Sequence, residues 1–168
     1  VDSIVRYTNQ LLQRQNDVNK LIVFSGNQVL DAIVNSKSTS AESMGVHVRA
    51  IITSSLSDVP PEDITIIIGN ALDNAIRAAK DSAGKTVELH IQPQGVYNSI
   101  MISNDVANPV LSGNPTLRTT KAMQQRHGFG VKNMRRAVDH NQGMIRFYEQ
   151  NNRFICDILL LNLPSKNE

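Results

Sequence analysis

The sequence has almost no capacity for covalent cross-linking. Cys156 is its only cysteine, so no disulfide can form within the chain. This excludes the small secreted proteins whose folds depend on disulfides, and it fits a reducing compartment. With 168 residues, the chain can bury roughly 70% of the surface that it exposes when unfolded. A hydrophobic core alone can therefore hold it folded.

Long apolar runs and a strong charge of one sign are also missing. No apolar run approaches the ~20 residues needed to cross a bilayer, and the start lacks the basic-then-apolar pattern of a signal peptide. The net charge of +2 is too small to indicate a nucleic-acid partner or a membrane surface. Because the chain opens on Val1 directly in helical pattern, we expect it to be part of a longer protein.

Hydrophobic periodicity predicts helices and strands along most of the chain. Helical spacing predicts helices over residues 5–24, 26–45, 60–82 and 130–143, and alternation predicts strands over residues 46–52, 87–92, 100–103, 144–150 and 153–163. Residues 105–127 follow neither period, which is typical of a lid or a disordered segment. We therefore expect an α/β fold, a two-layer sandwich whose helices cover one face of a mixed, mostly antiparallel sheet, with an N-terminal helical stub.

The third predicted helix carries a polar face opposite its apolar stripe. The polar residues recur at i, i+3, i+4 and i+7 and so share one side of the helix; they are Asn70, Asp73, Asn74 and Arg77. Asparagine and aspartate are weak helix formers. A solvated surface would explain them, and so would a set of oxygen ligands for Mg²⁺, which also coordinates nucleotide phosphates. Spacing alone leaves both interpretations open.

A glycine-containing motif leads from the long loop into the fourth predicted helix. It reads His127-Gly128-Phe129-Gly130-Val131. Glycine lets the backbone approach a ligand closely, and the free N–H groups of a helix start favour an anion. The motif is not a dinucleotide fingerprint, because the third glycine is missing and no strand precedes it. The chain also contains no GxxxxGK[ST] phosphate loop.

Together these motifs resemble the GHKL (Bergerat-fold) ATPases. Their order and spacing are most similar to the ATP-binding catalytic domain of sensor histidine kinases of the peptide-pheromone, quorum-sensing branch. The similarity rests on the run from Asn70 to Ala75, a strand ending near Asn104, the loop, and the glycine motif, and it extends upstream to Gly26, Asn27, Leu30, Asp31, Lys37 and Ala41. The resemblance implies that residues 1–25 are the second helix of a dimerisation hairpin and that residues 26–168 are the catalytic domain.

The resemblance also implies roles for individual residues. Asn74 would ligate Mg²⁺, and Asn70 stands where ATP-hydrolysing relatives carry a glutamate base. A neutral imidazole acceptor needs no such base, because it already has a nucleophilic lone pair. Lys121, in the run Thr119-Thr120-Lys121, would contact phosphate. The expected catalytic residues are Asn70, Asn74 and Lys121, and the expected nucleotide-binding residues are Asn70, Asp73, Asn74, Arg77, Asn104, Asp105, Thr120, Lys121, His127, Gly128, Phe129, Gly130 and Val131.

The adenine-reading motif departs from the wider family. The usual Asp-x-Gly-x-Gly is replaced by Ser103-Asn104-Asp105-Val106-Ala107, although the pheromone branch also carries asparagine there. We expect Asn104 to accept from the adenine amino group, with Asp105 as the second choice. An amide accepts more weakly than a carboxylate, so modest ATP affinity is expected.

The resemblance predicts a Mg-ATP-dependent protein-histidine kinase. It would transfer the γ-phosphoryl group to a histidine upstream of Val1, for relay to a response-regulator aspartate, as a homodimeric, cytoplasmic part of a membrane-anchored sensor. The four histidines of this chain, His47, His90, His127 and His140, do not fit the acceptor. Two alternatives remain: a degenerate docking or dimerisation module, favoured by the missing glycines near Asn104, and a serine-directed GHKL kinase, opposed by the N-terminal helix.

Overall fold

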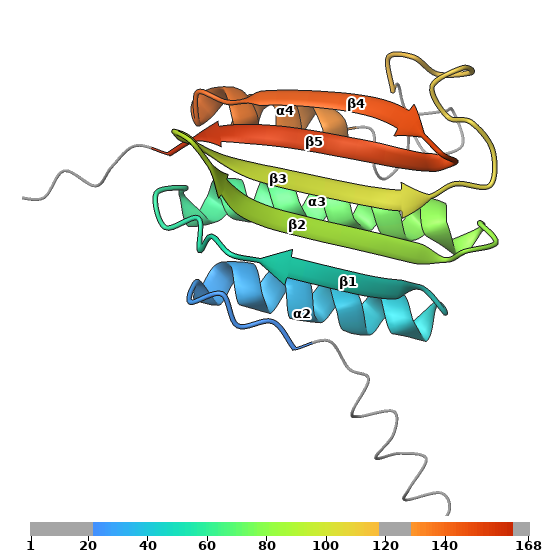
Figure 1. The fold of residues 1–168 in the computed structure, drawn as a ribbon, viewed down its shortest axis with the longest axis horizontal. Coiled ribbons are helices and arrows are strands. Elements are labelled where there is room, and N and C mark those ends of the chain that lie inside the picture. The colour runs from blue at the N-terminus through green and yellow to red at the C-terminus, as the bar shows by residue number, and fades with distance from the viewer. Residues whose placement is uncertain (1–21, 118–128, 163–168) are drawn as a thin grey trace, which may run out of the picture.

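The computed structural model describes residues 22–117 and 129–162, and this part forms two layers. A sheet makes one layer and helices cover one of its faces (Figure 1). The helices are α2 (Gln28–Ser43), α3 (Pro61–Lys80) and α4 (Gly130–His140), and the strands are β1 (His47–Ile52), β2 (Thr86–Gln94), β3 (Tyr97–Asp105), β4 (Met144–Gln150) and β5 (Arg153–Leu161). The predicted α/β sandwich is confirmed.

The sheet is mixed, as predicted. Its strand order is β1-β2-β3-β5-β4, with β1 and β2 parallel and the remaining neighbours antiparallel. The parallel pair is joined through α3, since parallel neighbours need a long crossover connection. The hairpin between β4 and β5 turns on Asn151 and Asn152, whose φ angles are 53° and 59°. The sequence predicted this turn from the tolerance of asparagine for positive φ.

The core lies between the helices and the covered face of the sheet. The six residues predicted to form the buried stripe of α3 are at most 4% exposed: Ile64, Ile67, Ile68, Ala71, Leu72 and Ala75. They meet alternate residues of the central strands, among them Leu89, Ile91, Ile100 and Ile102. Among the described residues no helix covers the other face (Figure 1), which is called the open face below.

The predicted N-terminal helix does not extend as far as expected. Residues 1–21 lie outside the described part of the chain, but residues 22–24 belong to the predicted helix and are not helical. The Val23 N–H donates to Asn35 Oδ1 at 2.7 Å, and Asn35 Nδ2 donates to the Val23 carbonyl at 3.1 Å. One side chain of α2 thus satisfies both backbone groups of Val23 without a helical turn. The prediction of a helix up to Phe24 is therefore wrong at its end.

Within the described segments, no helix has the length and apolar character that crossing a membrane requires.

The single cysteine is a core residue, as the sequence predicted. Cys156 is 5% exposed on β5, and burial, with a smaller contribution from the charge of Asp157, raises the pKa of its thiol from 9.0 to about 12. Above pH 9 the unfolded chain can lose this proton while the folded chain keeps it, so the free energy of unfolding falls between pH 9 and 12.

We therefore expect iodoacetamide at pH 8.5 to leave native Cys156 unmodified and to alkylate it readily in urea, as mass spectrometry would show. Because the thiolate is the reactive species, alkylation of the native protein at the rate of a free cysteine would contradict this burial.

Candidate functional site

Two sequence motifs that lie far apart in the chain meet between α3 and α4. The two helices run antiparallel: near one end, His140 Nδ1 lies 2.7 Å from the buried Asp63 Oδ2. At the other end, Gly130 faces the middle of α3. A Cβ atom built on Gly130 would lie 3.1 Å from Asn70 Oδ1. The polar face of α3 and the start of α4 therefore form one local site.

Two amide side chains of α3 offer oxygen atoms at this site. Asn70 Nδ2 donates to the Ile66 carbonyl one turn earlier, at 2.7 Å. This bond orients the amide so that its Oδ1 faces Gly130. Asn74 follows one turn later, and its side chain is exposed. Neither amide can act as a general base, whereas both can donate a lone pair to a hard cation.

The rest of the polar face does not point the same way. Asp73 Oδ1 lies 2.6 Å from Lys37 Nζ on α2, so Asp73 is engaged with α2, whereas Asn70 faces α4. Arg77 is partly buried one turn beyond Asp73. Asn70 and Asp73 thus point to different neighbouring helices, and Asn74, one turn after Asn70, is a second amide oxygen donor with an exposed side chain.

The start of α4 offers backbone donors beside Asn70. Phe129 is the N-cap residue but makes no side-chain capping bond, and its side chain is 68% exposed. The first turn carries no acidic residue. Uncapped N–H groups at a helix start favour a bound anion. The other predicted residues of this motif and of the loop, Thr120, Lys121, His127 and Gly128, lie outside the described part of the chain and stay predictions.

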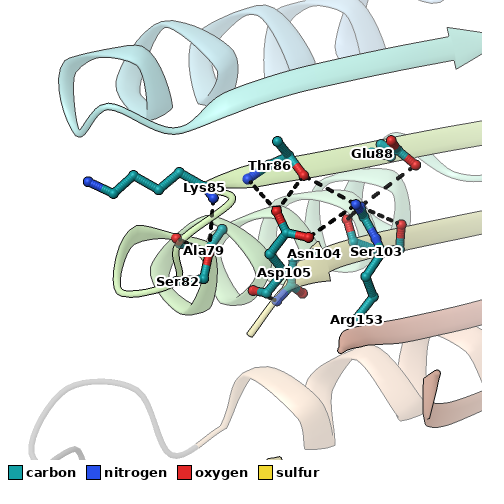
Figure 2. A network of polar contacts seen from close by, with 9 residues as sticks. All are labelled: Ala79, Ser82, Lys85, Thr86, Glu88, Ser103, Asn104, Asp105 and Arg153. Atoms are coloured by element: carbon teal, nitrogen blue, oxygen red, sulfur yellow. Dashed lines mark hydrogen bonds and ion pairs between the residues drawn. The ribbon is translucent and has the colours of Figure 1, made fainter. Parts of the chain in front are cut away.

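The two candidates for reading adenine lie on opposite faces of the sheet. Asn104, next to last in β3, is 2% exposed and shares the helix-covered face with Ile100 and Ile102. Its Nδ2 donates to the Asp105 backbone carbonyl at 2.9 Å. The Asp105 side chain points to the open face, where its Oδ2 accepts from the backbone N–H of Thr86 at 3.0 Å and from Thr86 Oγ1 at 2.6 Å (Figure 2). Asn104 is the candidate on the side of α3.

Asp105 belongs to a polar cluster, the open-face network, that sequence reasoning missed. Its members come from three strands and are Thr86, Glu88, Ser103, Asp105 and Arg153 (Figure 2). Arg153 Nη1 lies 3.3 Å from Asp105 Oδ1 and donates to Thr86 Oγ1 at 3.2 Å, and Nη2 donates to Ser103 Oγ at 3.0 Å. Gly84 leaves room for this carboxylate, since a Cβ there would be 2.2 Å from Asp105 Oδ2.

A second missed residue anchors the loop that follows β3. The carboxylate of Glu149 on β4 accepts from the backbone N–H groups of Val110 and Leu111. Val106 N–H donates to the Asn152 carbonyl in the β4–β5 turn at 3.2 Å. The first part of the loop after β3, which the sequence predicted to be a lid, is thus hydrogen-bonded to the β4–β5 hairpin. Nothing in the sequence pattern around Glu149 indicated this contact, which depends on the fold.

A surface hollow of about 610 Å³ lies elsewhere, between the C-terminal half of α4 and the edge strand β4. Its lining is Arg135, Asp139, Gly143, Met144, Ile145, Arg146, Asp157 and Leu159. It shares no residue with the candidate site. Over residues 22–117 and 129–162, no three histidine, cysteine or acidic side chains cluster so that they could hold a metal. A cation at the candidate site would therefore depend on amide and phosphate oxygens.

Comparisons with known proteins agree with this fold. A sequence family described as the GHKL domain matches residues 59–161. The catalytic domain of the histidine kinase ThkA is similar in structure, with a TM-score of 0.65 and 15% identity over 86% of this chain and 97% of that chain. The Acinetobacter baumannii histidine kinase AdeS is similar with a TM-score of 0.57 and 16% identity, over 79% of this chain and 64% of that one.

Full-length ShkA, in complex with AMPPNP, has a TM-score of 0.63 and 11% identity, over 82% of this chain and 30% of ShkA. No curated protein sequence matches significantly. At these identities the structural likeness shows the fold alone. This chain spans less than two thirds of AdeS and of ShkA. The peptide-pheromone branch is tested by none of these comparisons and stays a prediction.

Proposed function

Because this chain belongs to the GHKL domain family, we propose that it is the ATP-binding catalytic domain of a protein-histidine kinase. The observation that carries the proposal is that Gly130 lies beside Asn70, since a Cβ built on the glycine would be 3.1 Å from the amide oxygen. It joins the polar face of α3 to the uncapped start of α4. A polyanion with a bound cation needs such a combination of oxygen donors and backbone N–H groups.

Asn74 is the proposed ligand of Mg²⁺. Its side chain is exposed one turn after Asn70 on α3, and an amide oxygen is a suitable donor for a hard cation that keeps its other sites for water and phosphate oxygens. When bound, Mg²⁺ neutralises charge on the β- and γ-phosphates. Asn70 would hold the phosphate chain between α3 and α4, together with the N–H groups at the start of α4. Arg77, with Lys121 and Thr120 from the loop, is proposed to add charge and hydroxyl contacts.

Asn104 is the proposed contact of the adenine base. It lies at the end of β3 on the helix-covered face, and its amide oxygen could accept from the exocyclic amino group. The AMPPNP complex of ShkA, a protein of the same fold, supports a nucleotide site in this domain.

The reaction requires little from this domain beyond positioning. A neutral imidazole nitrogen of the acceptor forms a bond to the γ-phosphorus, while the bond from that phosphorus to the β–γ bridging oxygen breaks and ADP leaves. Such transfers depend mainly on alignment and charge neutralisation. Asn70 cannot deprotonate a water, so hydrolysis is not promoted in place of transfer. His140 is bonded to Asp63 away from Asn74, and His47 and His90 lie on strands.

The acceptor is therefore proposed to lie on a separate helix, for which residues 1–25 would supply the second half of the hairpin. Transfer would continue to a response-regulator aspartate in a homodimeric, cytoplasmic part of a membrane-anchored sensor of the peptide-pheromone branch.

The proposal is tested with γ-labelled ATP, Mg²⁺ and the phosphoacceptor helix of the kinase, supplied on the same polypeptide or in trans. We expect label on a histidine, stable to alkali and lost in acid. Label on serine, stable to acid, would instead indicate a serine-directed kinase. Absence of label, with nucleotide bound, would refute the kinase activity.

A further inference from the structure

We propose that the Asn104 amide is locked in one orientation, with its oxygen turned toward the base, and that the open-face network helps to hold this orientation. The arrangement would select a base with an exocyclic amino group, adenine, over one with a carbonyl at that position, guanine. This inference rests on the proposed nucleotide site and deepens it by assigning the origin of base selectivity.

An asparagine at this position can pair with a base in two ways, whereas a carboxylate can pair in only one. An ionised carboxylate can only accept hydrogen bonds, whereas an amide accepts through Oδ1 and donates through Nδ2. A freely rotating amide could pair its Oδ1 with the amino group of adenine or its Nδ2 with the carbonyl of guanine. Selectivity for adenine therefore requires that the amide of Asn104 be held in one of its two orientations.

The backbone of the next residue supplies this constraint. Asn104 Nδ2 donates to the Asp105 carbonyl at 2.9 Å. Rotation of the amide by 180° would bring Oδ1 against the same carbonyl, so that two acceptors would face each other at that distance. The Asn104 side chain is 2% exposed, so water has little room to separate them. An unsatisfied acceptor pair in a buried position is strongly disfavoured.

The side chain of Asp105 is held on the opposite face of the sheet. Asp105 is the last residue of β3, and the peptide that follows it is also held by the Val106 N–H, which donates to the Asn152 carbonyl at 3.2 Å. Its carboxylate is fixed by the N–H and the hydroxyl of Thr86 at 3.0 and 2.6 Å and by Arg153 at 3.3 Å (Figure 2). Arg153 also donates to the Ser103 carbonyl at 3.2 Å. In this proposal these contacts act together with the Val106–Asn152 bond to keep the Asp105 carbonyl turned toward Asn104 Nδ2.

Substitution of Thr86 tests the restraint on the Asn104 amide with the smallest change to the sheet. Thr86→Val removes the hydroxyl that donates to Asp105 and accepts from Arg153, while it keeps the shape, the β-propensity and the backbone N–H. Thr86→Ser keeps the hydroxyl and serves as the matched control. Thr86 is on the open face, where its hydroxyl bonds to Asp105 and Arg153 and not to Asn104.

The experiment is calorimetric titration of the wild type and both variants with AMPPNP and with GMPPNP, each with Mg²⁺. We expect the wild type to prefer AMPPNP by at least about tenfold, since a mismatched base leaves buried polar groups unpaired. Thr86→Val should lower that preference at least about fivefold, by weakening AMPPNP binding and not GMPPNP binding. Thr86→Ser should keep it.

The possible results separate this inference from the proposed function. If Thr86→Val leaves the ratio of the AMPPNP and GMPPNP affinities unchanged, whether or not both are weaker, the proposed restraint on Asn104 is refuted and the nucleotide site is not. A wild type that binds neither analogue would refute the proposed function and the inference together. Hydrogen exchange of the Asn104 side-chain amide, measured without nucleotide, should be slow in the wild type and faster in Thr86→Val; equal rates would also overturn the lock.

Discussion

Replacing Asn74 by alanine is expected to remove Mg²⁺-dependent nucleotide binding without harming the fold. Asn74 is exposed in the interior of α3, where alanine is the better helix former. Loss of groups that only support metal ligands typically weakens metal affinity about 10–100-fold, so loss of a direct ligand should exceed that range.

The measurement is thermal denaturation with and without AMPPNP and Mg²⁺. Because a ligand that binds only the folded state raises the melting temperature, the wild type should be stabilised by the nucleotide and Asn74→Ala should not. Thr65→Ala is the matched control, since Thr65 is an exposed polar residue of the same helix. Equal stabilisation of Asn74→Ala and the wild type would exclude Asn74 as the metal ligand.

Two glycine-to-alanine changes should shift stability in opposite directions. At Gly143, between α4 and β4, a Cβ would lie 2.3 Å from the Leu159 carbonyl oxygen and 2.9 Å from Leu160 Cδ2. Because the nearest atom is backbone, the sheet edge must move, and we expect a loss of about 3 kcal/mol, at the upper end of overpacking costs. At Gly69, inside α3, a Cβ meets no atom within 4 Å, so alanine should add about 0.5–1 kcal/mol.

Urea denaturation of the two variants checks this pair. Equal shifts of both midpoints in the same direction would contradict the packing of α4 and β4 against β5. A stabilised Gly69→Ala variant that still responds to nucleotide would further separate the stability of α3 from the polar face beside it.

The elements with strong periodicity could be predicted from the sequence alone. The buried stripe of α3, the proline at its first position and the asparagine turn between β4 and β5 each follow from local chemistry, and the structure has all three. Strands β2 and β3 are longer than predicted, because their ends are polar and are held by pairing. Asn98, for example, is buried and pairs with Pro93 on β2 and with Leu160 on β5.

The site was less predictable than the fold, because it depends on which neighbour each residue meets. Helical spacing put Asp73 beside Asn74, but only the packing of α2 shows that Asp73 pairs with Lys37. Likewise, the sequence put Asn104 first and Asp105 second as the adenine contact, but only the strand register assigned them to opposite faces. Thr86, Glu149 and Arg153 carried no motif, and their roles arise from contacts between distant strands.

The most direct test of the central claim is calorimetric titration of this chain with AMPPNP, with and without Mg²⁺. The proposed site predicts saturable binding that Mg²⁺ strengthens, with modest affinity because the Asn104 amide is uncharged. No binding at millimolar AMPPNP, to protein shown to be folded, would contradict it. The altered adenine motif would then have removed the function, and the domain would be a docking or dimerisation module.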